Sequence, residues 1–312
     1  MIINTGMRTD IPAYFSTWLI NRIRDGYVLV RNPYYPEQVT KYLLSPDVVD
    51  ILCFCTKNPA PMLPYMNELK EFRQFWFVTV TPYGKEIEPN VPDKRSVIES
   101  FQKLSSIVGK KSVSWRYDPI FISEKYSVDY HIRAFAKAAS KLRNYTEQAV
   151  ISFIDLYSKT RRNFPEAREV TKPERIEIGK AFAEIGKLNG FTVRTCFEGT
   201  ELAPYGIDVS GCITQDMLEN SLGITLDVPK KGTARPGCNC LLGNDIGAYN
   251  TCPHLCRYCY ANYDKQAVID NCKKHDPASP FLIGGHRPGD VITQAKQFSY
   301  ISNQLSLFQG LI

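Results

Sequence analysis

Apolar residues fall into two kinds of segment along most of this chain. Short runs rich in β-branched and aromatic residues read as buried strands, and longer segments with apolar residues every three to four positions read as amphipathic helices. Strands are expected at residues 50–56, 75–81, 112–118, 149–154 and 191–196. Helices are expected between them, at residues 62–72, 94–108, 127–142 and 174–189. This alternation predicts a parallel sheet with right-handed crossovers.

The N-terminal part does not follow this alternation. Residues 2–6 read as a short strand. Asp10 and Pro12 form a helix-start signal before an amphipathic stretch. A β-hairpin is expected around the proline-containing turn that follows, from residues 27–31 and 38–44.

The complete pattern predicts an α/β fold whose parallel strands form a barrel or a wound sheet. Residues 1–200 would form the barrel core. Residues 201–312 are irregular and rich in cysteine, and their strand at 245–249 would complete the barrel beside the strand at 2–6. Residues 263–275 read as a helix, and the rest as a tail covering the barrel.

Composition limits the class of protein. The 312 residues are 44% hydrophobic and 22% charged, as in a soluble globular protein with an ample core. No segment reads as a signal peptide or as the ~20 apolar residues of a membrane span, so a cytoplasmic protein without membrane contact is expected. The net charge of +6 permits a polyanionic partner without requiring one. Ten cysteines in such a chain favour metal ligands over disulfides.

Polar residues collect where the predicted strands end. They are Arg8–Asp10, Thr56–Asn58, Thr79–Thr81, Arg116–Asp118, Asp155 and Cys196–Glu198. The carboxyl ends of parallel strands form the active face of α/β folds, so a shared cleft is expected there. Arg116 and Asp118 have the same parity and would share a face, where they could bind polar substrate groups. An Arg–Asp pair at such a place is as often structural.

Three cysteines near the C-terminus have the spacing C-x3-C-x2-C: Cys252, Cys256 and Cys259. Three thiolates this close together can each bind one iron of a cubane cluster, which leaves the fourth iron open for chemistry. The alternative is a zinc knuckle with His254 or another cysteine as the fourth ligand.

This spacing resembles the signature of the radical S-adenosylmethionine enzymes, and Tyr258 fits the aromatic residue that the family carries before its third cysteine. The resemblance implies an α/β fold of the partial (β/α) TIM-like barrel type found in that family. It also implies a [4Fe–4S] cluster whose open iron binds S-adenosylmethionine. It further implies reductive cleavage of that cofactor to a 5'-deoxyadenosyl radical, which abstracts hydrogen from a substrate. An electron donor such as flavodoxin or ferredoxin is then an implied partner.

Residues 54–58 and 77–83 resemble the spore photoproduct lyase-like branch of that family. By that resemblance, Lys57 would pair with the methionyl carboxylate and Thr79 would hydrogen-bond the cofactor. Glu88 would lie on the cofactor's side of the barrel. Taken whole, the chain most resembles the family called domain of unknown function 1848, in its Arg-Thr-Asp-Ile-Pro opening and its terminal cysteine loop.

The chain departs from the lyase pattern in two ways. The cysteine loop follows the other strands instead of preceding them, which is a circular permutation; compact domains tolerate this because their termini lie close together. The lyase's hydrogen-donating cysteine has no counterpart at residues 6–8, so photoproduct repair does not transfer. Cys53, Cys55 and Lys57 alternate along one strand and share a face, so Cys55 could serve as the hydrogen donor. A buried structural cysteine is the alternative.

Four further cysteines make a complete ligand set for a second [4Fe–4S] cluster: Cys196, Cys212, Cys238 and Cys240. A four-cysteine zinc site and unrelated thiols remain alternatives. Cys272 reads as a bystander. A non-catalytic zinc or iron–sulfur adaptor for nucleic acid or protein is the rival to the enzyme. Within the enzyme hypothesis, a nucleic acid or a peptide stays open as the substrate.

Overall fold

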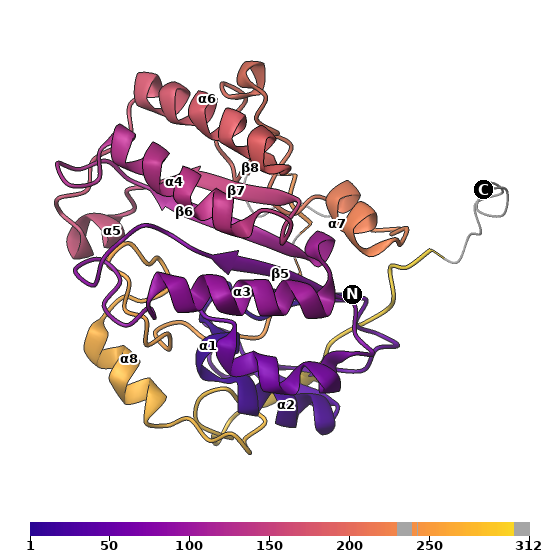
Figure 1. The fold of residues 1–312 in the computed structure, drawn as a ribbon. Helices are drawn as coiled ribbons and strands as arrows, with labels where there is room; N and C mark the ends of the chain where they lie inside the picture. Colours follow the sequence, from indigo (N-terminus) through magenta and orange to yellow (C-terminus); the bar gives the residue numbers. More distant parts are fainter. Residues whose placement is uncertain (230–238, 242, 303–312) are drawn as a thin grey trace, which may run out of the picture.

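The computed structural model describes residues 1–229, 239–241 and 243–302. Its main sheet has seven strands (Figure 1). Its strand order is β8-β7-β6-β5-β4-β1-β9, and every neighbouring pair is parallel. The strands are β1 (Ile2–Asn4), β4 (Ile51–Thr56), β5 (Gln74–Thr79), β6 (Val113–Ile120), β7 (Gln148–Phe153), β8 (Thr192–Thr195) and β9 (Asn244–Asp245). The α/β class is therefore confirmed.

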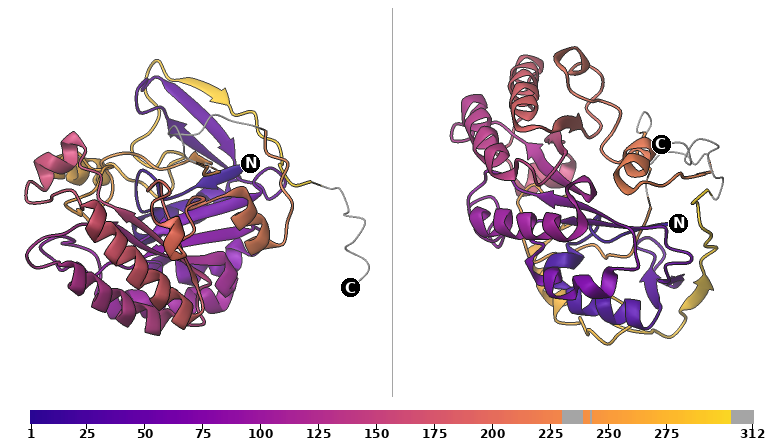
Figure 2. Two further views of the ribbon diagram at one scale, coloured as in Figure 1. Left: turned by 90° about the horizontal axis from the view of Figure 1, so that it is seen from above. Right: turned by 45° about the vertical axis from the view of Figure 1, so that its right-hand side comes forward.

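Three helices cover one face of this sheet: α3 (Lys94–Val108), α4 (Val128–Leu142) and α6 (Lys172–Asn189). Each begins at a side-chain cap, from Asp93, Ser127 and Thr171 respectively. Figures 1 and 2 show them side by side on the outer side of the curved sheet. The ring of Phe135 on α4 stacks on Phe182 of α6, with 3.7 Å between ring centroids. This aromatic contact joins α4 to α6.

The connection between β4 and β5 is a 3-10 helix, η1 (Ala60–Leu69), where an α-helix is expected. Pro64 lies inside it and cannot donate the backbone hydrogen bond that an α-helix requires. The N-terminal helix is divided into α1 (Ile11–Tyr14) and α2 (Ser16–Arg24). The shorter remaining elements are α5 (Ser158–Asn163), α7 (Gln215–Leu222), α8 (Lys265–Cys272), η2 (Lys110–Ser112) and η3 (Ala203–Tyr205).

The predicted hairpin forms a second, smaller sheet. Strands β2 (Tyr27–Arg31) and β3 (Gln38–Leu43) are antiparallel, and β10 (Val291–Gln294) adds to β3 in parallel. The chain before β10 packs on α2, where the indole nitrogen of Trp18 donates to the carbonyl oxygens of Ser279 and Phe281 at 2.9 and 3.1 Å. Residues 279–294 therefore lie against α2 and the hairpin, and residues 298–302 lie against Met1, Asp50 and residues 225–227.

The sheet is open. Its edge strands are β8 and β9, and within the part of the chain that the structure describes no pairing joins them into a closed barrel. Strand β9 lies beside β1 but is shorter than the expected 245–249. The reason is local: the backbone N–H of Gly247 donates to Oδ1 of Asp245 at 2.9 Å, which turns the chain away from the sheet.

Candidate iron–sulfur and cofactor sites

All predicted polar strand ends lie at one edge of the molecule, because the strands that carry them are parallel. Lys57 follows β4, Thr81 follows β5, and Cys196 follows β8. The cysteine loop leaves the same edge after β9. The sequence therefore brings the candidate residues to the face where α/β proteins bind ligands.

The cysteine loop is tightly folded on itself. Leu255 has a φ of 55°, a left-handed conformation that lets the chain reverse between the first two cysteines of the motif. The N–H of Cys259 donates to the carbonyl of Cys256 at 3.0 Å, and the amide of Asn262 donates to the carbonyl of Cys252 at 2.8 Å. These bonds hold the three cysteines within one compact turn.

Asp10 ties this loop to the start of the chain. Its Oδ1 accepts the N–H of Ala13 at 3.1 Å as the cap of α1. Its Oδ2 accepts the N–H of Lys57 at 2.7 Å and contacts Nε2 of His254 at 2.9 Å. The other ring nitrogen of His254 lies 2.9 Å from the hydroxyl of Tyr14. Both ring nitrogens are thus engaged by protein, so His254 shapes the loop, as its neighbouring proline indicates.

Glu88 is the centre of a buried polar network. Its carboxylate accepts hydrogen bonds from Lys57 at 2.8 Å, from Thr81 at 2.7 Å, and from Lys94 and Tyr258. Burial alone would raise the pKa of Glu88, but the two lysines hold it at about 2. The carboxylate is therefore ionised.

Lys57 stays charged for the complementary reason. Burial lowers the pKa of Lys57, but Glu88 and the neighbouring Cys256 raise it above the usual lysine value. Its ammonium group also lies 5.5 Å from the ring centroid of Tyr258. The structure thus groups three residues that the sequence nominates, namely Lys57, Glu88 and Tyr258.

The donor chemistry of the cysteine loop fits an iron–sulfur cluster. Cys252 and Cys256 are free thiols, and burial raises the pKa of both, that of Cys256 to about 12, while Lys57 lowers it. Nearby ammonium groups would stabilise the thiolates that metals require. In the described ranges, no three His, Cys, Asp or Glu side chains converge as ligands of one metal ion. A cubane binds each thiolate through a different iron, so its ligands lie further apart than those of a single ion.

Arg116 and Asp118 form a bidentate pair in the interior, with distances of 3.0 and 2.6 Å between guanidinium nitrogens and carboxylate oxygens. Burial lowers the pKa of Arg116, but Asp118 raises it well above its usual value. Cys55 lies nearby on β4, where burial raises its pKa to about 11 against the opposing charge of Arg116. Cys55 is therefore a protonated thiol at neutral pH.

Three of the four further cysteines lie together. The sulfur atoms of Cys212 and Cys240 are 3.4 Å apart, and Cys196 hydrogen-bonds Cys212. The thiol of Cys212 lowers the pKa of Cys196 to about 7, with burial opposing and Arg116 assisting. Cys238 lies outside the described residues. These cysteines lie near Arg116 and Asp118, whose charges act on the thiol of Cys196. In the order of the strands, β6 with this pair lies between β8, which Cys196 follows, and β9, which the cysteine loop follows.

Residues 2–261 match the family described as Domain of unknown function (DUF1848). This chain belongs to that family. The match spans the sheet and the complete cysteine loop of this DUF1848 protein. No curated protein matches the chain. Within the described residues, none of the helices of this DUF1848 protein is long and apolar enough to cross a membrane.

Sequence reasoning missed part of the polar network. Thr79 ends β5, but the hydroxyl that contacts Glu88 belongs to Thr81, two residues later on the same face. The sequence does not predict a role for Lys94 at the site, because Lys94 is the first residue of a helix whose polar face is expected to be solvated. A buried carboxylate needs compensating positive charge, so the placement of Glu88 beside Lys57 could have suggested a second cation near it.

Proposed function

We propose that this chain is a radical S-adenosylmethionine enzyme, in which a partial (β/α) barrel holds a [4Fe–4S] cluster on Cys252, Cys256 and Cys259. The observation that carries the proposal is the position of the thiol loop beside the charged network of Lys57 and Glu88. When bound, the cluster with S-adenosylmethionine supplies reductive cleavage of the sulfonium and hydrogen abstraction from an unactivated C–H bond.

The chain's own residues would bind and orient the cofactor. Lys57 holds a positive charge beside Cys256, where the family resemblance calls for a partner of the methionyl carboxylate. Glu88 fixes the position of both Lys57 and Tyr258. Thr79 is buried at the end of the adjacent strand, and its hydroxyl would hydrogen-bond the cofactor. The buried rings of Tyr83 and Phe121, stacked with 4.4 Å between centroids, exclude water from this side.

Other strand-end residues would meet the substrate. Arg116 and Asp118 carry opposite charges and suit polar substrate groups. Cys55 keeps its S–H at neutral pH because burial raises its pKa, and the S–H form is the one that donates a hydrogen atom. A nucleic-acid substrate would bind with a steep dependence on salt, and a peptide with a weaker one.

The grouping of Cys196, Cys212 and Cys240 supports a second metal centre, which Cys238 would complete. Four thiolates suit an auxiliary [4Fe–4S] cluster, or alternatively zinc. Replacement of Cys252, Cys256 and Cys259 together should leave about four irons per chain if the auxiliary cluster forms. Near-zero iron in that variant, or zinc in its place, would contradict a second iron–sulfur cluster.

The test of the enzyme is 5'-deoxyadenosine formation from S-adenosylmethionine with dithionite under anaerobic conditions. The Cys256→Ala variant should lose the product completely. Cys272→Ala is the matched control, because Cys272 is half-buried on α8 and its thiol donates to the carbonyl of Thr251 at 3.3 Å. Product formation by Cys256→Ala at the wild-type rate would contradict the assignment, and a zinc-loaded, inactive wild type would favour the adaptor.

A further inference from the structure

A hollow of about 1260 Å³ lies on the outer side of the cysteine loop. It is bordered by the loop itself, by α8 and by the end of α5. Cys256 lines the hollow. On the sheet side of the same thiol, the positive charges of Lys57 and Lys94 lower its pKa. On the surface of the described residues, this hollow gives direct access to Cys256, one of the proposed cluster ligands.

The hollow combines an apolar floor with a cationic border. Leu255 and Ile269 contribute apolar surface, and Ile269 is 38% exposed. The lining cations are Arg162, Arg257, Lys265 and Lys273. An apolar centre inside a charged rim is the usual anatomy of a transient protein interface.

Acidic residues offset only part of this charge. Glu166 pairs with Arg257 at 2.7 Å, and Asp270 lies 3.5 Å from Lys273. Asp264 also lines the hollow, but its carboxylate caps α8 by accepting the N–H of Ala267 at 2.8 Å.

Arg162 keeps its full charge, because its guanidinium donates to a neutral backbone carbonyl, that of Tyr263, at 2.6 Å. Lys265 is exposed in the first turn of α8. These two residues therefore provide a positive edge that is exposed to solvent.

We propose that this hollow docks an acidic one-electron carrier protein, which reduces the cluster through the Cys256 side. This inference rests on the proposed function. In the step, one electron leaves the reduced cofactor of the carrier and enters the iron–sulfur group, and no atom is transferred. The carrier is oxidised by one electron and the cluster is reduced by one. The cationic border attracts an acidic carrier and orients it, which raises the rate of encounter.

The probe is a reduced, acidic flavodoxin, and the variant is Arg162→Glu with Lys265→Glu. Flavodoxin binding to the as-purified chain should weaken by at least about tenfold at low salt, because two attractive charges become repulsive. Lys265→Glu alone should give a smaller loss, and it covers the case in which the double variant folds poorly. Binding by the wild type should weaken as salt is raised from 0.05 to about 0.5 M.

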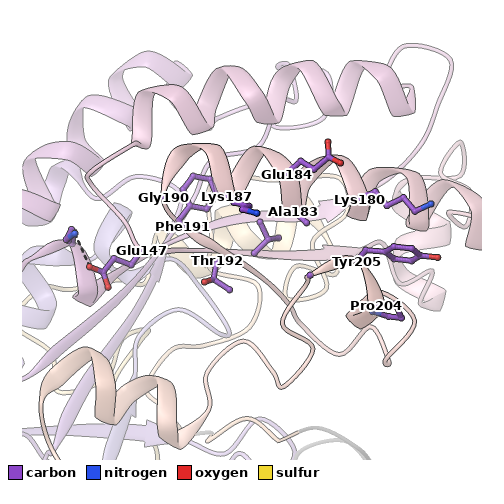
Figure 3. A pocket seen from close by; sticks show the side chains of 13 residues that line it. Glu147, Lys180, Ala183, Glu184, Lys187, Gly190, Phe191, Thr192, Pro204 and Tyr205 are labelled. Carbon is purple, nitrogen blue, oxygen red and sulfur yellow. Dashed lines mark ion pairs between the residues drawn. The ribbon is translucent and has the colours of Figure 1, made fainter.

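A matched control lies at the opposite edge of the sheet. A second hollow, of about 980 Å³, borders Glu147 just before β7 and the first residues of β8, and two of its lining lysines, Lys180 and Lys187, lie on α6 (Figure 3). The pair Lys180→Glu with Lys187→Glu makes the same change in net charge and should leave flavodoxin binding within about twofold of the wild type. Equal losses in the two double variants, or no loss in either, would overturn the docking surface.

Activity separates this inference from the function on which it rests. Flavodoxin-driven formation of 5'-deoxyadenosine should fall at least about tenfold in Arg162→Glu/Lys265→Glu, because the carrier reaches the site less often. The dithionite-driven rate should stay unchanged, since that reductant needs no docked protein. A wild type that binds flavodoxin at this surface but is inactive with dithionite would contradict the enzyme and leave the interface in place. Wild-type activity with dithionite and no charge-dependent binding would contradict the interface alone.

Discussion

The carboxylate of Asp10 lies 2.9 Å from Nε2 of His254, although 244 residues separate the two in the chain. Asp10 also accepts the N–H of Lys57, so one side chain joins the first helix, the end of β4 and the cysteine loop. Both Asp10 and His254 are buried. This contact sets the position of the thiols relative to the Lys57–Glu88 network.

The first prediction concerns that contact. Asp10→Asn keeps the shape of the side chain but replaces one acceptor oxygen with a donor, so Lys57 N–H or His254 loses its partner. The free energy of unfolding should fall by about 2 kcal/mol, the cost of an unsatisfied buried polar group. Urea unfolding followed by circular dichroism measures it. Asp129→Asn is the control, because Asp129 is exposed and pairs with Arg133 on the surface of α4. Equal stability of the two variants would show that the Asp10 contact is dispensable.

The second prediction compares two glutamates two residues apart. Glu88→Gln leaves Lys57 and Lys94 without their buried counter-charge and should cost about 3–5 kcal/mol in unfolding free energy. Glu86 pairs with Lys125 near the surface, so Glu86→Gln should cost less than about 1 kcal/mol. Chemical unfolding of both variants measures the difference. A loss of unfolding free energy in Glu88→Gln as small as that in Glu86→Gln would show that the network does not depend on the Glu88 carboxylate.

The third prediction concerns acid sensitivity. His131 is fully buried, with Nε2 donating to the carbonyl of Phe121 and Nδ1 accepting from Tyr117, both at 2.9 Å. Burial lowers the pKa of His131 from 6.5 to about 4. A lowered pKa means that the unfolded state binds more protons, so stability is present above pH 6.5 and is lost as the pH falls towards 4.

Between pH 7.5 and 5 the wild type should lose about 2 kcal/mol more than His131→Gln, which has no titrating ring. The readout is the difference in slope of unfolding free energy against pH, which is independent of the variant's overall stability. Parallel slopes for the two proteins would show that folding does not lower the pKa of His131.

The fourth prediction concerns the packing between β4 and the residues after β1. A Cβ added to Gly6 would lie 2.2 Å from the carbonyl oxygen of Cys55, which is a clash with backbone. Gly6→Ala should therefore lower the thermal midpoint of unfolding by several degrees. At Gly285 an added Cβ would meet nothing within 4 Å, so Gly285→Ala should have little effect on the midpoint. Similar midpoints for both variants would contradict the close approach.

Much of the fold is predictable because its signals are local. Apolar runs predict the five strands β4 to β8, and α3 spans the residues 94–108 that its helical periodicity predicts. Whether the sheet closes depends instead on twist and curvature, which accumulate over the whole sheet and leave no local pattern. The strand predicted at residues 245–249 is also longer than the observed edge strand β9, because the side chain of Asp245 accepts the N–H of Gly247 and turns the chain away.

The candidate site is predictable to a similar extent. Parity places Arg116 and Asp118 on one face, and the spacing of the cysteines indicates their loop. The partnership of His254 with Asp10 and of Lys94 with Glu88 arises only when distant segments meet in the folded chain. No sequence pattern links these residues.

The most direct test of the account is the iron and acid-labile sulfide content of the anaerobically purified protein. The account predicts about eight irons and eight sulfides per chain, two four-iron clusters, and about four of each if only the Cys252–Cys256–Cys259 cluster forms. Zinc without iron, persisting after anaerobic reconstitution with iron and sulfide, would contradict the central claim.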